Sequence, residues 1–347
     1  MISIQEEYWK QYELIESHIE KGICLYGACS NGIWVLEYLK KKGYKVVCFC
    51  DSAQEKIGQI IEDIPVVSWE EAKQKFEGII FITTKHYVKD ILETIQYKKA
   101  ISFDTWFLLK NYEKYKKIQF DDKKSNVVLQ GIMKSMLTGD EIYCSEVAEG
   151  NAYFGMPSFF TNVRTYVDVG TFVGDSLENF IFAVGGCFDK IYAFEPGYRQ
   201  YEALQCRCKR LEQEWALESE KIVLEQSGVG DPKEQYVLQE GNGGLSATKL
   251  CKIENGTGDG IVSLDDYFAD KKISLLKADI EGMEMDMLRG GEAVIMRDKP
   301  RLAICVYHRP DDLFNIYEFI KRLVPEYKVL LRQHSARLVE TVLYCYI

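Results

Sequence analysis

The sequence lacks the features typical of nucleic-acid-binding, membrane-spanning and secreted proteins. Among its 347 residues, 43 lysines and arginines stand against 53 aspartates and glutamates, and the net charge of -10 disfavours contact with a nucleic-acid backbone. No apolar run reaches the roughly 18 residues that a membrane span requires, so no transmembrane segment is expected. The N-terminal stretch mixes polar and aromatic side chains, which is not the pattern of a signal peptide.

Cysteine spacing gives no sign of a metal centre or of a disulfide framework. The chain has eleven cysteines, but none of them forms a Cys-x-x-Cys pair. Five lie in apolar runs that are typical of buried strands: Cys24, Cys48, Cys50, Cys305 and Cys345. We therefore expect buried, reduced thiols in a cytoplasmic protein.

The first part of the chain alternates between strand and helix patterns. A lead-in helix is expected over 4–20, strands over 22–27, 44–50 and 78–83, and helices over 31–42, 69–76 and 88–95. Such alternation predicts a parallel sheet with right-handed crossovers. We therefore place a Rossmann-like N-terminal domain at 1–110. A connector at 111–163 follows, with a polar linker near 110–117 and a helix near 125–137.

A second alternating series occupies 164–347. Its predicted strands are 165–169, 190–194, 221–225, 273–278, 301–307, 328–332 and 341–347, and its predicted helices are 176–183, 198–211, 283–296 and 313–323. The last two strands have no helix between them, so they should form an antiparallel hairpin at the sheet edge. The predicted fold class is α/β, with two doubly wound Rossmann-like domains. The second has the layout of a seven-stranded class I methyltransferase sheet.

A glycine-containing loop follows the first strand of this second series. Asp168 ends the strand, Gly170 and Gly174 lie in the turn, and Asp175 opens a helix. Glu195 ends the next strand, 21 residues after Gly174, where a carboxylate can accept hydrogen bonds from both hydroxyls of a ribose. This pattern suits a nucleoside such as that of S-adenosylmethionine or NAD. The alternative is a tight turn with a solvated glutamate.

Charged residues also gather near the ends of two later strands. Lys277, Asp279 and Glu281 alternate on one face of an otherwise apolar strand. Charge on that face would lie at the carboxyl edge of the sheet, where α/β proteins bind ligands. A lysine–aspartate ion pair with a helix-capping glutamate is the structural alternative. His308 follows the next strand and has a pKa suited to proton transfer near neutral pH.

The N-terminal domain carries an imperfect dinucleotide fingerprint. Gly27 and Gly32 bracket a turn between a strand and a helix, and Asp51 ends the next strand, but Cys29 replaces the middle glycine. Three interpretations stay open: a nucleotide or nucleotide-sugar pocket, an NAD site, and a scaffold without ligand. The domain also resembles the small Rossmann-like domains that precede sugar-modifying enzymes.

From about Ser125 to the C-terminus, the sequence resembles the FkbM-type methyltransferases. The matching segments are Asp168–Asp175, Phe194–Pro196, Ser263–Tyr267, Lys277–Gly282, Lys299–Pro300, Tyr307–His308 and Glu340–Tyr344. Phe172 departs from the pattern, since the family usually has a small or amide residue there. The resemblance implies S-adenosylmethionine as the cofactor and methyl transfer to an oxygen, often on a sugar or glycan-linked group.

The resemblance also implies roles for individual residues. The predicted cofactor-binding residues are Asp168, Gly170, Gly174, Asp175, Glu195, Gly228 and Val229. The predicted catalytic residues are His308, Asp279, Glu281 and Lys277. His308 or Asp279 would remove the acceptor proton, or Asp279 and Glu281 would hold a divalent metal. Two alternatives are an NAD-dependent nucleotide-sugar oxidoreductase or epimerase and a non-enzymatic nucleotide-sugar-binding protein.

Overall fold

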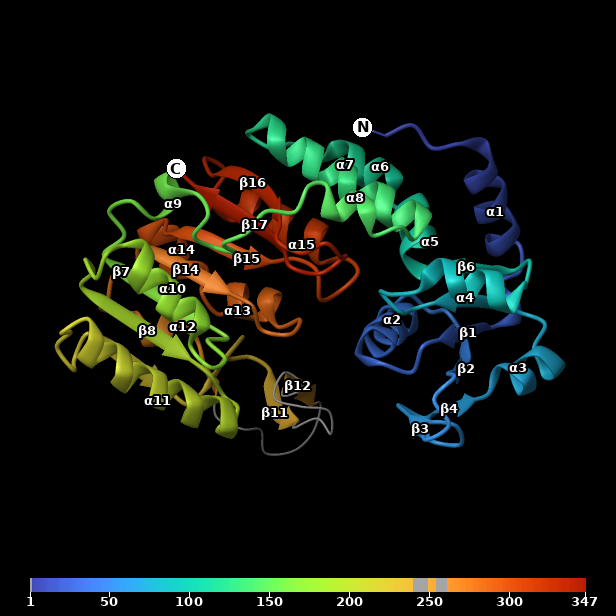
Figure 1. Cartoon of the computed structure of the whole chain (residues 1–347), viewed down its shortest axis with the longest axis horizontal. Coiled ribbons are helices and arrows are strands. Elements are labelled where there is room, and N and C mark those ends of the chain that lie inside the picture. The colour runs from blue at the N-terminus through green and yellow to red at the C-terminus, as the bar shows by residue number, and fades with distance from the viewer. Residues whose placement is uncertain (1, 240–248, 254–260) are drawn as a thin grey trace. The chain divides into compact units, whose positions relative to one another are not determined.

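The chain forms two compact units in the computed structural model, which describes residues 2–239, 249–253 and 261–347. The first unit consists of residues 1–148 with the short segments 307–311 and 335–339. The second consists of residues 149–306, 312–334 and 340–347. Figure 1 labels the helices and strands of both units.

The first unit contains a six-stranded mixed sheet in the order β3-β4-β2-β1-β5-β6. Its strands are β1 (Ile23–Tyr26), β2 (Val46–Cys50), β3 (Ile60–Ile61), β4 (Ile64–Val67), β5 (Ile79–Ile82) and β6 (Ala100–Ser102). Its helices are α1 (Glu6–Glu16), a 3-10 turn (Ile19–Lys21), α2 (Ser30–Lys41), α3 (Trp69–Lys75), α4 (Val88–Ile95), α5 (Phe103–Lys110), α6 (Tyr112–Lys117), α7 (Lys123–Thr138) and α8 (Ile142–Ser145). Every residue of β5 is buried, as expected of a central parallel strand.

The second unit contains a seven-stranded sheet in the order β16-β17-β15-β14-β7-β8-β9. These strands are β7 (Thr165–Val169), β8 (Lys190–Phe194), β9 (Ile222–Glu225), β14 (Leu275–Ala278), β15 (Arg301–Cys305), β16 (Lys328–Gln333) and β17 (Thr341–Tyr346). Two small sheets pair β10 (Gly228–Val229) with β13 (Ile261–Val262) and β11 (Gln235–Gln239) with β12 (Lys249–Ile253). The helices are α9 (Pro157–Phe160), α10 (Asp175–Ala183), α11 (Tyr198–Glu214), α12 (Leu264–Tyr267), α13 (Glu284–Arg289), α14 (Glu292–Asp298) and α15 (Asp312–Leu323).

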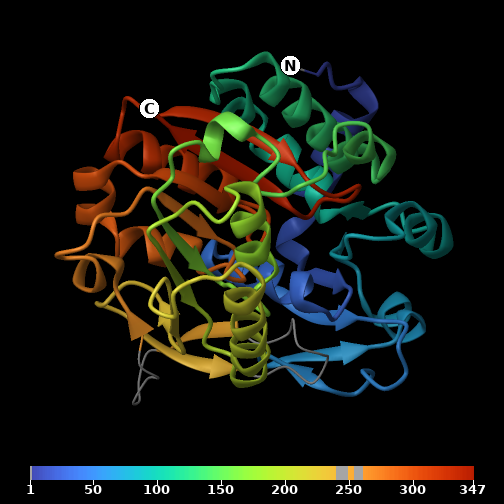
Figure 2. The same cartoon turned by 60° about the vertical axis from the view of Figure 1, so that its left-hand side comes forward.

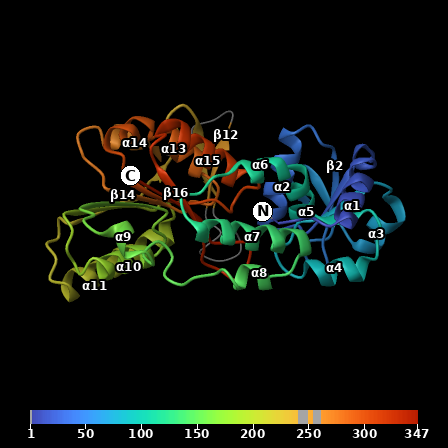
Figure 3. The ribbon, with the colours of Figure 1, turned by 90° about the horizontal axis from the view of Figure 1, so that it is seen from above.

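Helices cover both faces of this second sheet. Figure 3 shows α9, α10 and α11 on one face and α13, α14 and α15 on the other. The β16–β17 hairpin, red in Figure 2, lies at one edge, and β17 is antiparallel to both of its neighbours. The chain runs from β7 to β8 and β9 on one side, and from β14 to β15 on the other. The carboxyl ends of β7 and β14 therefore form the switch point, where open α/β sheets bind ligands.

The α/β fold and the class I strand order of the second sheet, with its closing antiparallel hairpin, are confirmed. The first sheet has six strands where the sequence predicts three, because β3, β4 and β6 are only two to four residues long. The expected polar linker near 110–117 is instead helix α6. The domain boundaries drawn from the sequence stay a prediction. Across the described ranges, no helix is long and apolar enough to cross a membrane.

Candidate active site

A buried ion pair joins the two strands at the switch point. Lys277 Nζ on β14 lies 3.0 Å from Asp168 Oδ1 on β7, and the two residues are directly paired in the strand register. The same ammonium donates to Gly170 O at 2.7 Å, and Ser176 Oγ donates to Asp168 Oδ2 at 2.6 Å. Burial acts to lower the pKa of Lys277, but Asp168 and Asp279 raise it above its usual range. The pair therefore ties the loop after β7 to β14.

This loop needs glycine at two positions for different reasons. Gly170 has φ +75°, and a Cβ there would lie 2.0 Å from the backbone oxygen of Asp279. Only glycine allows that close approach between the loop and the end of β14. Gly174 has φ +89° and immediately precedes α10, whose first residue, Asp175, is exposed. Phe172 also has a positive φ, +53°, which is strained for a bulky residue.

Glu195 faces the same loop from the end of β8. Its Oε2 accepts from Phe172 N at 3.0 Å, and its Oε1 accepts from Gly197 N at 2.8 Å. The residue is buried, and this burial raises the pKa of the Glu195 carboxyl to about 7 despite those two hydrogen bonds. The structure thus holds Glu195 against the glycine-containing loop, and its role as a ribose acceptor stays a prediction.

Asp279 follows β14 and is held by a tyrosine from a distant loop. Tyr153 OH donates to Asp279 Oδ2 at 3.0 Å and lies 3.3 Å from Cys305 Sγ. The ring is also 5.3 Å from Lys277 Nζ. Burial, and then the charge of Asp279, raise the pKa of the Tyr153 phenol well above its usual range, which keeps it a donor. Tyr153 N in turn donates to Tyr344 OH at 2.9 Å, so β17 fixes this loop.

The turn after β14 brings a further carboxylate into the region. Glu281 and Gly282 both have positive φ, +54° and +88°, and the chain then enters α13. Glu284, the first residue of that helix, is buried and accepts from Ile280 N at 2.9 Å. Asp279, Glu284 and His308 each offer one ligand atom, and these atoms lie within 4.8 Å of one another. Two carboxylates and an imidazole form a donor set suited to a divalent cation.

The sequence favours Glu281 as the second carboxylate of a metal pair, whereas this group contains Glu284. Glu284 escapes notice in the sequence because an acid in the first turn of a helix is expected for the helix dipole alone. The contact between Tyr153 and Asp279 could not be found in the sequence, because 126 residues separate the two. The structure brings Asp168, Gly170 and Lys277 into contact. The role of every predicted site residue stays a prediction.

Two of the predicted cofactor-binding residues lie on a short buried strand. Gly228 and Val229 form β10, which pairs with β13. A Cβ at Gly228 would lie 2.1 Å from Leu250 Cδ1, so this glycine allows side-chain packing. Beside them, Glu225 at the end of β9 accepts from Tyr267 OH at 2.6 Å.

The fingerprint of the first unit has a related arrangement. Asp51 Oδ2, after β2, accepts from Ala28 N at 2.9 Å and from Lys56 Nζ at 3.1 Å. A Cβ at Gly32 would lie 2.1 Å from Gly27 O, so this glycine permits close packing between α2 and the turn after β1. Gly27, Gly32 and Asp51 therefore stabilise the turn between β1 and α2 through these contacts.

The comparisons with known proteins point to one family. Residues 168–328 match the family model described as the methyltransferase FkbM domain. Among solved structures, the chain is similar to the methyltransferase FkbM from Methylobacillus flagellatus KT, with a TM-score of 0.58 and 20% identity over 96% of this chain and 92% of that chain. A search of curated proteins gives no match.

Two more distant solved structures are also methyltransferases. One is an rRNA methylase from Streptococcus thermophilus, with a TM-score of 0.35 and 16% identity over 55% of this chain and 91% of that chain. The other is an SAH-bound methyltransferase from Podospora anserina, with a TM-score of 0.31 and 10% identity over 76% of this chain and 96% of that chain.

The family match spans the glycine-containing loop, Glu195 and the end of β14, and the full-length structural likeness shows the fold. The oxidoreductase and non-enzymatic interpretations are therefore set aside. The chain contains an FkbM methyltransferase domain and is an S-adenosylmethionine-dependent methyltransferase.

Proposed function

We propose that the protein transfers the methyl group of S-adenosylmethionine to a hydroxyl oxygen of a sugar or a glycan-linked group. The observation that supports this most is the contact between the cofactor loop and the end of β14, where Gly170 closely approaches the backbone of Asp279. The half-buried carboxylate of Asp279 thereby lies beside the loop where we expect the methyl donor to bind. A reducing, cytoplasmic setting suits the eleven cysteines, all of which are free.

Methyl transfer requires the enzyme to orient the acceptor oxygen and, in addition, to supply a base for its proton. The sulfonium is already activated, so the enzyme's main task is to hold the acceptor oxygen in line with the methyl group. A sugar hydroxyl is a weak nucleophile, and Asp279 or His308 would accept its proton as the new bond forms. Tyr153 donates to Asp279 and would aim the other carboxylate oxygen at the acceptor. Lys277, bound to Asp168, would act by positioning the cofactor loop.

A divalent metal is compatible with the same residues. Asp279, Glu284 and His308 would hold it, since a pair of carboxylates and an imidazole suit Mg²⁺ or Mn²⁺. When bound, the ion would polarise the acceptor hydroxyl and lower its pKa. Glu281, half-buried on the adjacent turn, would then face the acceptor.

Radiolabelled S-adenosylmethionine tests this proposal directly. The full chain is incubated with a panel of free sugars and cell-envelope glycans, and methyl ethers are identified by mass spectrometry after hydrolysis. Asp279→Asn and His308→Ala should lower turnover far more than affinity for S-adenosylhomocysteine, and Tyr153→Phe should do so to a smaller extent. Label on nitrogen or carbon, or near-full activity in both Asp279→Asn and His308→Ala, would contradict the proposal.

We also propose that the fingerprint of the first unit binds a nucleotide or nucleotide-sugar. Supporting it, Asp51 and Lys56 lie beside the amide of Ala28 at the carboxyl edge of β1 and β2. A panel of nucleotides and nucleotide sugars should raise the melting temperature of the full chain, and Asp51→Asn should weaken that response. A flat response to the whole panel would favour a scaffold without ligand.

A further inference from the structure

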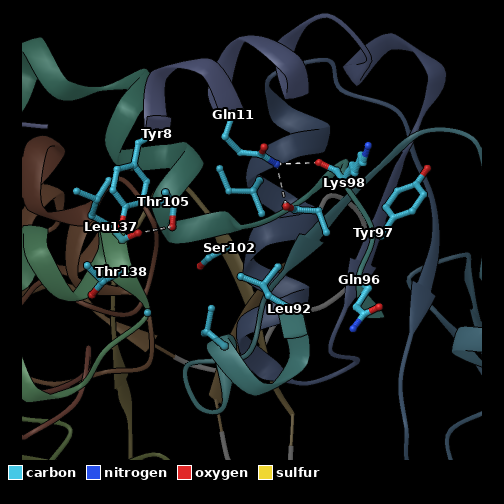
Figure 4. A pocket seen from close by; sticks show the side chains of 14 residues that line it. Tyr8, Gln11, Leu92, Gln96, Tyr97, Lys98, Ser102, Thr105, Leu137 and Thr138 are labelled. Atoms are coloured by element: carbon cyan, nitrogen blue, oxygen red, sulfur yellow. Dashed lines mark hydrogen bonds between the residues drawn. The ribbon is translucent and has the colours of Figure 1, made fainter. Parts of the chain in front are cut away.

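The first unit contains a pocket that no step of methyl transfer uses. It has a volume of about 420 Å³, within the range of small-molecule sites. Figure 4 shows its walls: α1 lies above it, α4 below, and the C-terminal end of α7 at one end. Strand β6, which is an edge strand of the sheet, lies along the pocket.

The wall between α1 and β6 is fixed by one amide. Gln11 Nε2 on α1 donates to Lys98 O at 2.9 Å and to Ala100 O at 3.2 Å. These are carbonyls at the edge of the sheet, where a further strand would otherwise donate. The side-chain amide therefore takes the place of a neighbouring strand and anchors α1 beside the pocket (Figure 4). Because both donors of this amide are used, its Oε1 is the atom left to accept from a ligand.

A serine of the pocket wall has a hydroxyl that caps no helix. Ser102 ends β6, lines the pocket and is only 3% exposed. It is the N-cap residue of α5, yet its side chain makes no capping hydrogen bond. Within the described part of the chain, no residue bonds to its Oγ. Its Oγ is therefore a polar atom in the pocket wall that can donate to or accept from a bound ligand.

The residues that line the pocket disfavour a charged ligand. No carboxylate lines the pocket, and its one lining cation, Lys98, is an exposed residue at the end beside Tyr97. Lys89, on α4 and outside the lining, pairs with Asp140 at 2.6 Å. A phosphate would lack a dedicated partner here. The lining instead combines hydroxyls, amides, aliphatic side chains such as Leu92, and the rings of Tyr8 and Tyr97.

We propose that this pocket is a binding site for a neutral saccharide of one or two sugar units. Hydroxyls and amides of the lining bond sugar hydroxyls, and tyrosine rings suit the apolar faces of pyranose rings. Ser102 Oγ and Gln11 Oε1 are the central contacts. The site is separate from the sheet that carries the methyltransferase residues, so it stands whether or not the methyl acceptor is a sugar.

Saturation-transfer NMR and calorimetry on the full chain test this inference. The probes are glucose, galactose, mannose, rhamnose, N-acetylglucosamine and maltose, each at millimolar concentration. At least one should bind saturably, and UDP should not compete with it. Leu92→Trp fills the pocket and should abolish binding, whereas Glu93→Trp, one residue along and exposed, should not. Ser102→Ala should weaken binding about 3- to 10-fold, since it removes one hydrogen bond.

Three further results separate this site from the methyltransferase centre. Affinity for S-adenosylhomocysteine should be unchanged in Leu92→Trp and Ser102→Ala. Sugar binding should survive Asp279→Asn. The inference is overturned if no sugar of the panel binds, if binding is lost in Asp279→Asn but kept in Leu92→Trp, or if UDP displaces the sugar.

Discussion

Glu195 is the residue that we propose to couple the second sheet to the cofactor. Both of its carboxylate oxygens already accept backbone amides, from Phe172 and Gly197, so the side chain cannot swing away from the loop. Hydrogen bonds to a charged group are stronger than neutral ones, and a ribose would add two of them to the remaining lone pairs. These two hydrogen bonds therefore fix the carboxylate in the position that the proposed ribose contact would use.

The variant Glu195→Gln tests that role. The amide group turns one acceptor oxygen into a donor that opposes Phe172 N or Gly197 N. Loss of charged hydrogen bonds should weaken S-adenosylhomocysteine binding about 10- to 100-fold, as measured by calorimetry. Glu202→Gln, on the exposed side of α11, serves as the control and should bind normally. Equal affinity in both variants would remove Glu195 from the cofactor site.

The pKa of Glu195 gives the free protein a distinct pH dependence. Burial raises it to about 7, against about 4.3 in an unfolded chain. The folded state therefore holds this proton more tightly, and the resulting stability is present below about pH 4 and lost as the pH rises through 7. Between about pH 5 and 8, the unfolding free energy of the wild type should fall by on the order of 2–3 kcal/mol relative to Glu195→Gln. Urea titrations at both pH values measure this, and a constant difference would contradict the assignment.

At the scale of elements, the paired strands β7 and β14 depend on the Asp168–Lys277 ion pair. Lys277→Met leaves a buried, uncompensated carboxylate and should reduce the free energy of unfolding by about 3–5 kcal/mol. Adding Asp168→Leu should restore much of that loss, because the remaining charge is removed. Arg164→Ala, which breaks an exposed pair with Asp189, should cost less than about 1 kcal/mol. A loss in Lys277→Met no larger than this control would show that the pair is not structural.

The turn after β7 depends on the absence of a side chain at Gly170. In Gly170→Ala the new Cβ would lie 2.0 Å from Asp279 O, so the loop must move away from β14. We expect loss of S-adenosylhomocysteine binding by at least about 10-fold and a loss of unfolding free energy beyond the ~1–2 kcal/mol of the positive φ alone. Gly185→Ala is the matched control, with φ +59° and no atom within 4 Å of its Cβ. If both variants bind S-adenosylhomocysteine with equal affinity, the close approach of Gly170 to Asp279 is not needed for cofactor binding.

Both units have the same type of hydrogen bond at the carboxyl edge of their sheets. In each, an acid after the second strand accepts the amide of a residue in the turn after the first: Ala28 with Asp51, and Phe172 with Glu195. This arrangement holds the turn and the acid together before a ligand binds. The spacing of glycine and acid made both turns predictable from the sequence, because the spacing follows from one strand–helix–strand repeat.

For the whole molecule, the second sheet could be predicted because its strands are apolar runs separated by clear helical patterns. The strands β3, β4 and β6 of the first sheet could not, since runs of two to four residues carry no reliable period. In the site, local motifs pointed to Asp168, Glu195 and Asp279. The contact of Tyr153 with Asp279 and the place of Ser102 in a pocket could not be predicted, because both depend on residues distant in the sequence.

A crystal structure of the full chain with S-adenosylhomocysteine tests the central claim most directly. We predict the adenosine ribose within hydrogen-bonding distance of the Glu195 carboxylate, and the sulfur near the carboxyl ends of β7 and β14, facing Asp279. A ligand bound elsewhere, or a crystal soaked to saturation in which Phe172 closes the space beside Glu195 and no ligand enters, would contradict it.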